Sequence, residues 1–310
     1  MNDLREIRIG VLGGGISAER DISLISSRQV YKDLSDKGLN IVFIDIVTKE
    51  KGKIKELIHN LNIDLAFIAL HGEFGEDGQI QEILEELGIV YTGSEPRASA
   101  LAMNKFNSKN LFKAKGIPTP DFVVLSKGED IPSGLRYPLV VKPFSSGSSI
   151  GISIVENKDN LRSALELGFL HSDSVILEDY IEGRELTVGI LGDQPLAVVE
   201  IIPKEGYFDF EAKYSNGGSS FIAPAQIDDE VEKNIRAVVL AAHSILGCRH
   251  FSRVDMRLSK EGLPFILEVN SIPGLTSHSL FPLSAKAWGI NFNQLIIKMM
   301  ELTLYGKKET

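Results

Sequence analysis

The sequence predicts a mixed fold, in which an N-terminal parallel α/β unit precedes a strand-rich α+β part. Over about the first 95 residues, short apolar runs alternate with helical segments, and this alternation indicates a parallel sheet with helices on its faces. From residue 121 onward strands predominate. Between these parts, residues 96–120 are predicted to form one helix followed by Gly116 and two prolines, so we expect a domain boundary near residue 100.

The alternation in the N-terminal unit brings polar residues to one edge of its sheet. Ligands of such sheets bind at the carboxyl ends of the strands. Glu19 and His71 each lie just beyond a predicted strand, so we expect both to face the same crevice. The predicted strands are 7–14, 39–47 and 64–70, and the predicted helices are 18–37, 51–62 and 79–88.

The second part of the chain is expected to divide again, so that the predicted units are 1–100, 101–182 and 183–310. Residues 206–224 are polar, aromatic and glycine-rich, and a loop of this length inside a compact domain is usually functional. A helix over 230–247, a hairpin over 251–270 and a last helix follow. The strands predicted before the long loop are 122–125, 137–144, 150–155, 175–181, 185–192 and 195–203.

Composition and charge argue against several classes of protein. The 310 residues carry a net charge of −9, which argues against a nucleic-acid-binding protein. The single cysteine, Cys248, allows no disulfide within the chain. No stretch approaches the roughly 18 apolar residues of a membrane span, and the N-terminus has no apolar signal region. We therefore expect a cytoplasmic protein without a membrane segment.

The first strand ends in VLGGGISAERDIS, residues 11–23, which resembles a dinucleotide-binding turn. Gly13, Gly15 and Ala18 fit the G-x-G-x-x-G/A pattern and would indicate an NAD-dependent oxidoreductase, with Asp45 as a loose candidate for the ribose-binding acid. Glu19 follows directly, however, where a pyrophosphate would meet a carboxylate. At this point both interpretations remain open.

The segment FSRVDMRLSKEGLPFILEVN, residues 251–270, predicts an oxygen-rich metal site. If Glu261 and Gly262 form a two-residue hairpin loop, Asp255 lies opposite Glu268, and Arg253 lies opposite Asn270. Two carboxylates and an amide oxygen suit Mg²⁺, which leaves coordination positions for phosphates and water. The alternative is a solvated hairpin with surface ion pairs. The apolar run around Glu268 disfavours it, because a buried charge should be paired or metal-bound.

Two further segments indicate a nucleotide site. Lys142 ends an apolar strand before a Ser/Gly loop, and such a loop can fold its backbone N–H groups over a polyphosphate. The alternative for this segment is a plain hairpin turn with an exposed lysine. In VILEDYIEGRELTVGILG, residues 175–192, a strand ends in a connector that can offer hydrogen bonds to a purine, whereas the alternative is an ordinary acidic turn. The candidate residues here are Glu178, Tyr180, Ile181 and Glu185.

Together these segments resemble the ATP-grasp superfamily, and within it the D-alanine–D-alanine ligase family. The resemblance covers nearly the whole chain. It rests on nine motifs in the right order: GGGISAERDIS, ALHGEFGEDG, YTGS, ALAMNK, VVKPFSSGSSIG, LEDYIEGRELTVGILG, FEAKYS, RVDMRL and LEVNSIPGLTSHS. It implies an N-terminal substrate-binding α/β domain, a central ATP-grasp subdomain and a C-terminal ATP-grasp subdomain that carries the metal and catalytic residues.

The resemblance implies a reaction and its cofactors. Members of this family phosphorylate the carboxylate of one D-alanine with ATP and let a second D-alanine attack the acylphosphate. The dipeptide then enters peptidoglycan synthesis. ATP and Mg²⁺, or Mn²⁺ in its place, are the implied cofactors, and a bacterial homodimer is the implied assembly. A ligase with other substrates, a catalytically inactive nucleotide-binding module and the NAD-dependent oxidoreductase are the rival interpretations.

The resemblance also assigns roles to residues of this chain. Tyr214, where this family has Tyr for D-alanine and Phe for D-lactate as second substrate, favours a dipeptide product. The implied metal ligands are Asp255, Glu268 and Asn270, and the implied ATP-binding residues are Lys105, Lys142, Glu178, Tyr180, Ile181, Glu185 and Lys213. Glu19 and His71 are assigned to the first D-alanine, Ser148 and Tyr214 to closing the site, Arg253 and Gly274 to the tetrahedral intermediate, and Ser279 and Leu280 to the second D-alanine.

Overall fold

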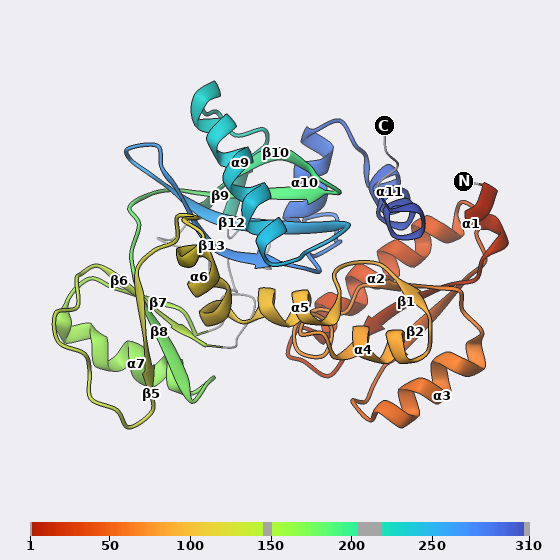
Figure 1. Cartoon of the computed structure of the whole chain (residues 1–310), viewed down its shortest axis with the longest axis horizontal. Helices are drawn as coiled ribbons and strands as arrows, with labels where there is room; N and C mark the ends of the chain where they lie inside the picture. The colour runs from red at the N-terminus through yellow and green to blue at the C-terminus, as the bar shows by residue number, and fades with distance from the viewer. Residues whose placement is uncertain (1, 145–150, 204–218, 307–310) are drawn as a thin grey trace.

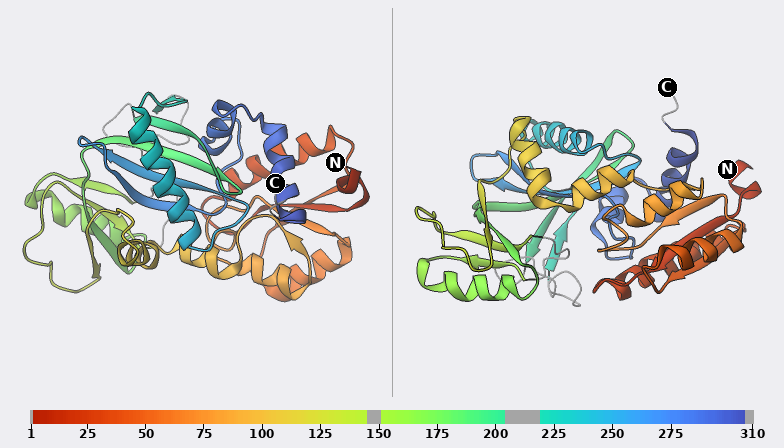
Figure 2. Two further views of the ribbon diagram at one scale, coloured as in Figure 1. Left: turned by 45° about the horizontal axis from the view of Figure 1, so that its top comes forward. Right: turned by 60° about the horizontal axis from the view of Figure 1, so that its bottom comes forward.

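The computed structural model describes residues 2–144, 151–203 and 219–306, and these ranges form three sheets. The first and second sheets lie at opposite ends of the molecule, and the third sheet lies between them (Figures 1 and 2). This arrangement leaves the third sheet in a position to share sites with both of the others.

The first sheet is the predicted parallel one. Its strand order is β2 (Ile41–Ile46), β1 (Ile9–Gly14), β3 (Leu65–Ile68) and β4 (Val90–Tyr91), and every neighbouring pair is parallel. Parallel strands need crossover connections, which helices provide here. These helices are α2 (Arg20–Ser35), α3 (Lys51–Leu61) and α4 (Gln79–Glu86), and a short α1 (Asn2–Glu6) precedes them. The predicted N-terminal α/β architecture is confirmed.

The single helix predicted after residue 96 is wrong, because the segment forms two helices. α5 (Pro96–Met103) and α6 (Lys105–Ala114) meet at Asn104, whose backbone is extended (φ −84°, ψ 97°). The Asn104 side chain accepts a hydrogen bond from the backbone N–H of Asn107 and so caps α6. The break makes Lys105 the first residue of a new helix.

The second sheet is antiparallel and has the order β5 (Phe122–Ser126), β8 (Ser174–Asp179), β6 (Leu139–Pro143), β7 (Ser153–Val155). A short helix, α7 (Leu161–Phe169), follows the 3-10 turn η1 (Lys158–Asn160) and was not predicted. Leu161 and Leu165 of α7 are buried in the core of this sheet together with Val141 and Leu177. The helix therefore covers one face and leaves the other face free to line a site.

The third sheet is also antiparallel, with the order β11 (Ser219–Ile222), β10 (Gln194–Pro203), β9 (Gly183–Leu191), β12 (Phe251–Ser259), β13 (Pro264–Asn270). The loop predicted over 206–224 is wrong at its end, because β11 pairs with β10 there.

Helices pack on both faces of the third sheet. Val188 shares a core with Val239 of α9 (Asp229–Ile245), whereas a Cβ atom on the next residue, Gly189, would lie 2.6 Å from Phe281 of α10 (Leu280–Ala287). Because alternate residues of a strand point to opposite faces, α9 and α10 cover opposite faces.

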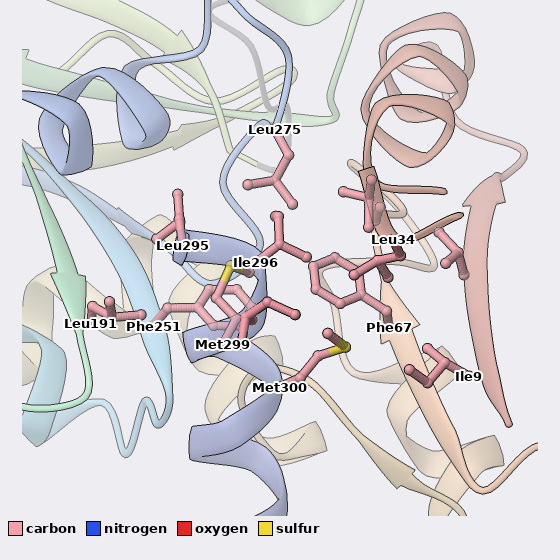
Figure 3. Packing of buried hydrophobic residues seen from close by; sticks show 14 of the residues in the cluster. Ile9, Leu34, Phe67, Leu191, Phe251, Leu275, Leu295, Ile296, Met299 and Met300 are labelled. Atoms are coloured by element: carbon pink, nitrogen blue, oxygen red, sulfur yellow. The ribbon is translucent and has the colours of Figure 1, made fainter. Parts of the chain in front are cut away.

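The last helix, α11 (Phe292–Tyr305), joins the third sheet to the first. It begins with a capping box between Asn291 and Gln294. Figure 3 shows its side chains lying between Phe67 of β3 on one side and Phe251 of β12 on the other, and all of these residues belong to one buried cluster. Although it is the last helix of the chain, α11 thus packs against the N-terminal sheet. Nowhere in the described ranges does a helix combine the length and apolar character needed to cross a lipid bilayer.

Candidate active site

A cleft lies between the second and third sheets and encloses about 960 Å³, part of it open to solvent. The cleft brings together eight residues that the sequence singled out: Lys105, Lys142, Glu178, Tyr180, Ile181, Glu185, Asp255 and Glu268. Lys142 and Glu178 come from the second sheet, and Glu185, Asp255 and Glu268 come from the third. The folding of the two sheets against each other brings these charged groups together.

The hairpin β12–β13 has the predicted pairing, but not for the predicted reason. Asp255 lies opposite Glu268, and Arg253 lies opposite Asn270. The turn, however, has three residues, 260–262, because Ser259 N–H donates to the carbonyl of Leu263 (2.9 Å). A β-bulge next to Asp255 adds one residue to β13 and restores the register. The longer turn shifts the pairing by one residue, and the bulge shifts it back, so Asp255 still lies opposite Glu268.

Asp255 is held by two neighbours on the third sheet. Arg253 donates to both of its oxygens (Nε to Oδ1 2.8 Å, Nη2 to Oδ2 2.6 Å), and Thr187 Oγ donates to Oδ1 (2.6 Å). This geometry fixes the orientation of the carboxylate. Since an ionised carboxylate has about four lone-pair sites, capacity for a cation remains.

Glu268 forms an ion pair with Lys105 of α6, at 2.8 Å between Nζ and Oε2. Burial works against the charged form of Lys105, but the carboxylates of Glu268 and Glu76 outweigh it, and the pKa of Lys105 lies above its ordinary value. The ammonium group of Lys105 thus lies beside the predicted metal site, where it pairs with one of the predicted ligands, Glu268.

Glu178 is buried between two lysines. Lys142 Nζ lies 2.9 Å from its Oε1, and Lys109 Nζ lies 2.7 Å from its Oε2. Burial would raise the pKa of Glu178, but the two ammonium groups outweigh it and hold that pKa below its ordinary value. Burial lowers the pKa of Lys109 to about 8, despite the attraction of Glu178.

Lys109 and Arg257 also belong to this region, although no sequence motif had singled them out. Lys109 lies four residues after Lys105, and two residues with this spacing share a face of a helix, so the spacing was the available signal. Arg257 lies two residues after Asp255 on β12 and lines the cleft with it.

Glu19 and the segment His71–Gly72 lie next to each other beside the first sheet. Ser17 Oγ, two residues before Glu19, donates to the His71 carbonyl (2.8 Å), and a Cβ atom on Gly72 would lie 2.5 Å from Glu19 Oε2. The two ring nitrogens of His71 lie 3.1 Å from the Ile272 carbonyl and 2.9 Å from Ser26 Oγ. His71 therefore joins the first sheet to the loop after β13.

That loop contains Gly274 and Ser279, and Leu280 is the first residue of α10, which follows it. Ser279 Oγ lies 2.9 Å from Thr276 Oγ1 and accepts a hydrogen bond from the Thr276 N–H (3.0 Å). A Cβ atom on Gly274 would lie only 2.8 Å from Ser279 Oγ, so the absence of a side chain lets the hydroxyl approach the backbone. Leu280 is buried in a small apolar cluster with Val199 and Ile201. Ser148, Lys213 and Tyr214 lie outside the described residues.

The glycine-rich turn after β1 has no room for a pyrophosphate beside Gly13 or Gly14. A Cβ atom would lie 2.0 Å from Ser27 Oγ at Gly13, and 2.0 Å from Asp45 Oδ1 at Gly14. Arg20 fills the remaining space, because its Nη1 donates to the carbonyls of Gly15 and Ile46 (3.0 Å each) and its Nη2 bonds Asp45 (2.8 Å). Asp45, the loose candidate for a ribose-binding acid, thus pairs with Arg20.

Two family models match the chain. Residues 47–94 match the D-ala D-ala ligase N-terminus, and residues 111–301 match the D-ala D-ala ligase C-terminus. A D-alanine--D-alanine ligase of Geobacter sulfurreducens is 42% identical over 313 residues, covering 99% of this chain and 98% of the relative. One of Methylacidiphilum infernorum is 43% identical and covers 98% and 97% of the two chains.

Solved structures agree with this similarity. A D-alanine--D-alanine ligase from Bacillus anthracis, complexed with ATP, is 35% identical, has a TM-score of 0.84, and covers 96% of this chain and 97% of its own. A D-Ala:D-Ser ligase from Enterococcus faecalis is 34% identical, has a TM-score of 0.82, and covers 96% and 99%.

Proposed function

The chain belongs to the D-alanine–D-alanine ligase family, and from this premise we propose how its cleft performs the reaction of that family. The protein uses ATP to join two D-alanine molecules, passing through a D-alanyl phosphate and releasing ADP and phosphate. The product, D-alanyl-D-alanine, is a peptidoglycan precursor. The ATP-grasp architecture matches that of the solved ligases.

One observation supports the location of the chemistry most directly. Lysines 105 and 142 approach the cleft from α6 and the second sheet, while Asp255 and Glu268 approach it from the third sheet. Transfer of a phosphoryl group depends on positioning and on neutralising charge around the phosphates. A cleft that presents cations and carboxylates to one space is suited to that task.

We assign the nucleotide to this cleft. Lys105, Lys142 and Lys213 bind the phosphates. The base is bound by Glu178 at the end of β8 and by Tyr180 and Ile181 of the connector that follows. Glu185 lies beyond the connector, where a carboxylate can accept hydrogen bonds from ribose hydroxyls. The binding of ATP displaces the Lys142–Glu178 and Lys105–Glu268 pairs at least in part, because phosphates compete for the same ammonium groups.

We assign a magnesium ion to Asp255, Glu268 and Asn270. The donor set fits, because all three offer oxygen atoms, and both carboxylates face the cleft from adjacent strands. When bound, the ion neutralises charge on the phosphates and on the transferring group. Before ATP binds, Arg253 pairs with Asp255 and Lys105 pairs with Glu268.

The substrates are assigned to the side of the molecule where the first sheet meets the loop after β13. Glu19 binds the ammonium group of the first D-alanine, and His71 orients that region. Arg253 and the Gly274 N–H stabilise the negative charge of the tetrahedral intermediate. Ser279 and Leu280 bind the second D-alanine, and Ser148 and Tyr214 close the site against water.

We also propose that the protein is a cytoplasmic homodimer. The family resemblance supports this assembly, and light scattering of the purified protein tests it. A mass near twice 34.1 kDa is expected, and a mass of 34.1 kDa would contradict it.

The decisive test measures ATP- and Mg²⁺-dependent phosphate release with D-alanine and identifies the product by mass. We expect D-alanyl-D-alanine with D-alanine and no product with L-alanine. D-lactate and D-serine, offered as the second substrate, test the prediction from Tyr214 that D-alanine is preferred. Phosphate release without the dipeptide mass would contradict the proposed use of the site.

A further inference from the structure

Arg257 lines the cleft beside the proposed nucleotide-base site, and no role in binding or catalysis has been assigned to it above. It is a residue of β12 directly opposite Glu185 of β9. Its guanidinium donates to the carbonyls of Ile181 (Nε, 3.1 Å) and Gly183 (Nη2, 2.8 Å) and to the Tyr180 hydroxyl (Nη2, 3.1 Å). Its Nη1 also lies 3.3 Å from Glu185 Oε2.

These contacts fall on the short connector between the second and third sheets. β8 ends at Asp179 and β9 begins at Gly183, so residues 180–182 alone join the two sheets here. Arg257 reaches this connector from the third sheet and binds the carbonyls on both sides of Glu182. The connector is therefore held in one conformation by a side chain that is not part of it.

The guanidinium also packs against an aromatic ring. Its carbon atom lies 5.2 Å from the centroid of the Tyr180 ring, a distance at which a cation is attracted to the ring face. The Arg257 side chain is only 14% exposed and that of Glu185 only 18%. In such a partly desolvated setting their attraction is stronger than at the surface. Arginine alone offers a planar fork that can bond several acceptors and stack at the same time.

We propose that Arg257 is a positioning residue of the nucleotide pocket, which holds the Glu185 carboxylate and the Ile181 carbonyl where the ribose and base of a ribonucleoside triphosphate bind. The inference rests on the proposed binding of ATP in this cleft. Glu185 needs a fixed geometry to accept hydrogen bonds from ribose hydroxyls, and the Arg257 guanidinium fixes its Oε2 from the neighbouring strand. Arg257 thereby contributes to the selection of a nucleotide that carries ribose hydroxyls.

The test compares ATP with 2′,3′-dideoxy-ATP in the wild-type protein and in Arg257→Met and Arg257→Lys variants. For wild type, we expect kcat/KM to be about tenfold or more in favour of ATP, since hydrogen bonds to a charged group contribute about 1.5–3 kcal/mol. In Arg257→Met this preference should fall toward one and KM for ATP should rise about tenfold, with KM for D-alanine unchanged. Glu185→Gln should shift the preference in the same direction.

Two further variants keep the test decisive. Arg257→Lys retains a positive charge beside Glu185 but loses the fork, so it should fold and show a reduced preference; if Arg257→Met does not fold, Arg257→Lys decides alone. Lys260→Met is the matched control, because Lys260 pairs with Glu182 of the same connector but both side chains are exposed (64% and 70%). Its kinetic constants should equal those of wild type.

The outcomes separate this inference from the proposed function. A folded Arg257→Lys variant with an unchanged preference for ATP would overturn the inference, as would a wild-type enzyme that does not distinguish the two nucleotides. Absence of ATP-dependent ligation in the wild type would instead remove the proposed function itself, before any variant is compared.

Discussion

The turn after β1 and the hairpin β12–β13 both place charged residues next to an apolar strand, yet they differ in what surrounds those charges. At the turn, Arg20 bonds Asp45 and two backbone carbonyls, and the space beside Gly13 and Gly14 is filled by protein atoms. At the hairpin, Asp255 and Glu268 line a cleft.

A glycine pattern therefore indicates where the backbone packs closely, and it does not identify which ligand binds there. Glycines at the turn allow α2 and β2 to approach β1 closely, whereas the polar residues of the hairpin surround free space. Substitutions in a charged cluster that is packed against protein atoms should lower stability. Substitutions in a charged cluster that lines a cleft should lower activity.

The largest effect is expected at the hairpin, from Glu268→Gln. The variant keeps an oxygen for Lys105 but removes the charge that a cation needs, so kcat should fall on the order of 10²–10³-fold. Steady-state kinetics at saturating ATP and a magnesium titration measure this. Glu261→Gln is the control, because Glu261 is exposed in the turn of the same hairpin. Wild-type activity in Glu268→Gln would show that the hairpin holds no catalytic cation.

A large effect on stability is expected at the turn, from Gly13→Ala. The added Cβ would meet Ser27 Oγ at 2.0 Å and Ser27 Cβ at 2.5 Å, so α2 must move away from β1. Such overpacking should lower the free energy of unfolding by about 3 kcal/mol, as measured by urea denaturation.

Two matched variants sharpen this prediction. Gly52→Ala, in α3 with no atom within 4 Å of the added Cβ, should stabilise the protein by about 0.5–1 kcal/mol. The double variant Gly13→Ala/Ser27→Gly should recover part of the loss. If Gly13→Ala instead kept its stability and lost nucleotide binding, the turn would be a phosphate site after all.

A smaller effect is expected from Ser26→Ala, where the two regions meet. Ser26 Oγ on α2 lies 2.9 Å from His71 Nε2 and accepts a hydrogen bond from the N–H of Leu275 (3.3 Å), in the loop after the hairpin. Its removal leaves buried groups without this partner and should cost about 1–2 kcal/mol. KM for D-alanine should rise as well. Ser35→Ala, exposed on the same helix, is the control, and equal stability of the two variants would contradict the prediction.

At neutral pH the smallest effect is expected at His250, just before β12 and away from the cleft, because the effect develops only as the pH falls. Burial lowers the pKa of His250 from 6.5 to about 4. Between these values the unfolded chain binds the proton more readily than the folded one, so the stability from this group is complete above pH 6.5 and is lost as the pH falls to 4.

His250→Asn should therefore lose less stability than wild type between pH 6.5 and 4, as measured by thermal unfolding. Asparagine suits the site because residue 250 has a positive φ of 64°, which asparagine tolerates. His59→Asn, exposed on α3, should behave like wild type. An identical acid response of His250→Asn and wild type would show that His250 is not the titrating group.

Much of the fold could be predicted because it repeats locally. Alternating apolar runs and helices predicted the parallel sheet, and the pairing of Asp255 with Glu268 was also predicted. The pairing was correct only because the bulge beside Asp255 compensated for a turn one residue longer than expected. The break at Asn104 was not predicted, because the apolar pattern on both sides of it is helical. Only the backbone angles show that Asn104 is extended and caps a second helix.

Which chemical groups the chain carries, in which order, and on which face of a strand they lie can be inferred from the residues alone, because the period of a strand is local. Packing between distant elements instead makes Lys109 share Glu178 with Lys142, places α11 between the first and third sheets, and brings Arg257 to the connector. These partners are far apart in the chain. Their contacts depend on how whole sheets and helices pack, and no local period encodes that packing.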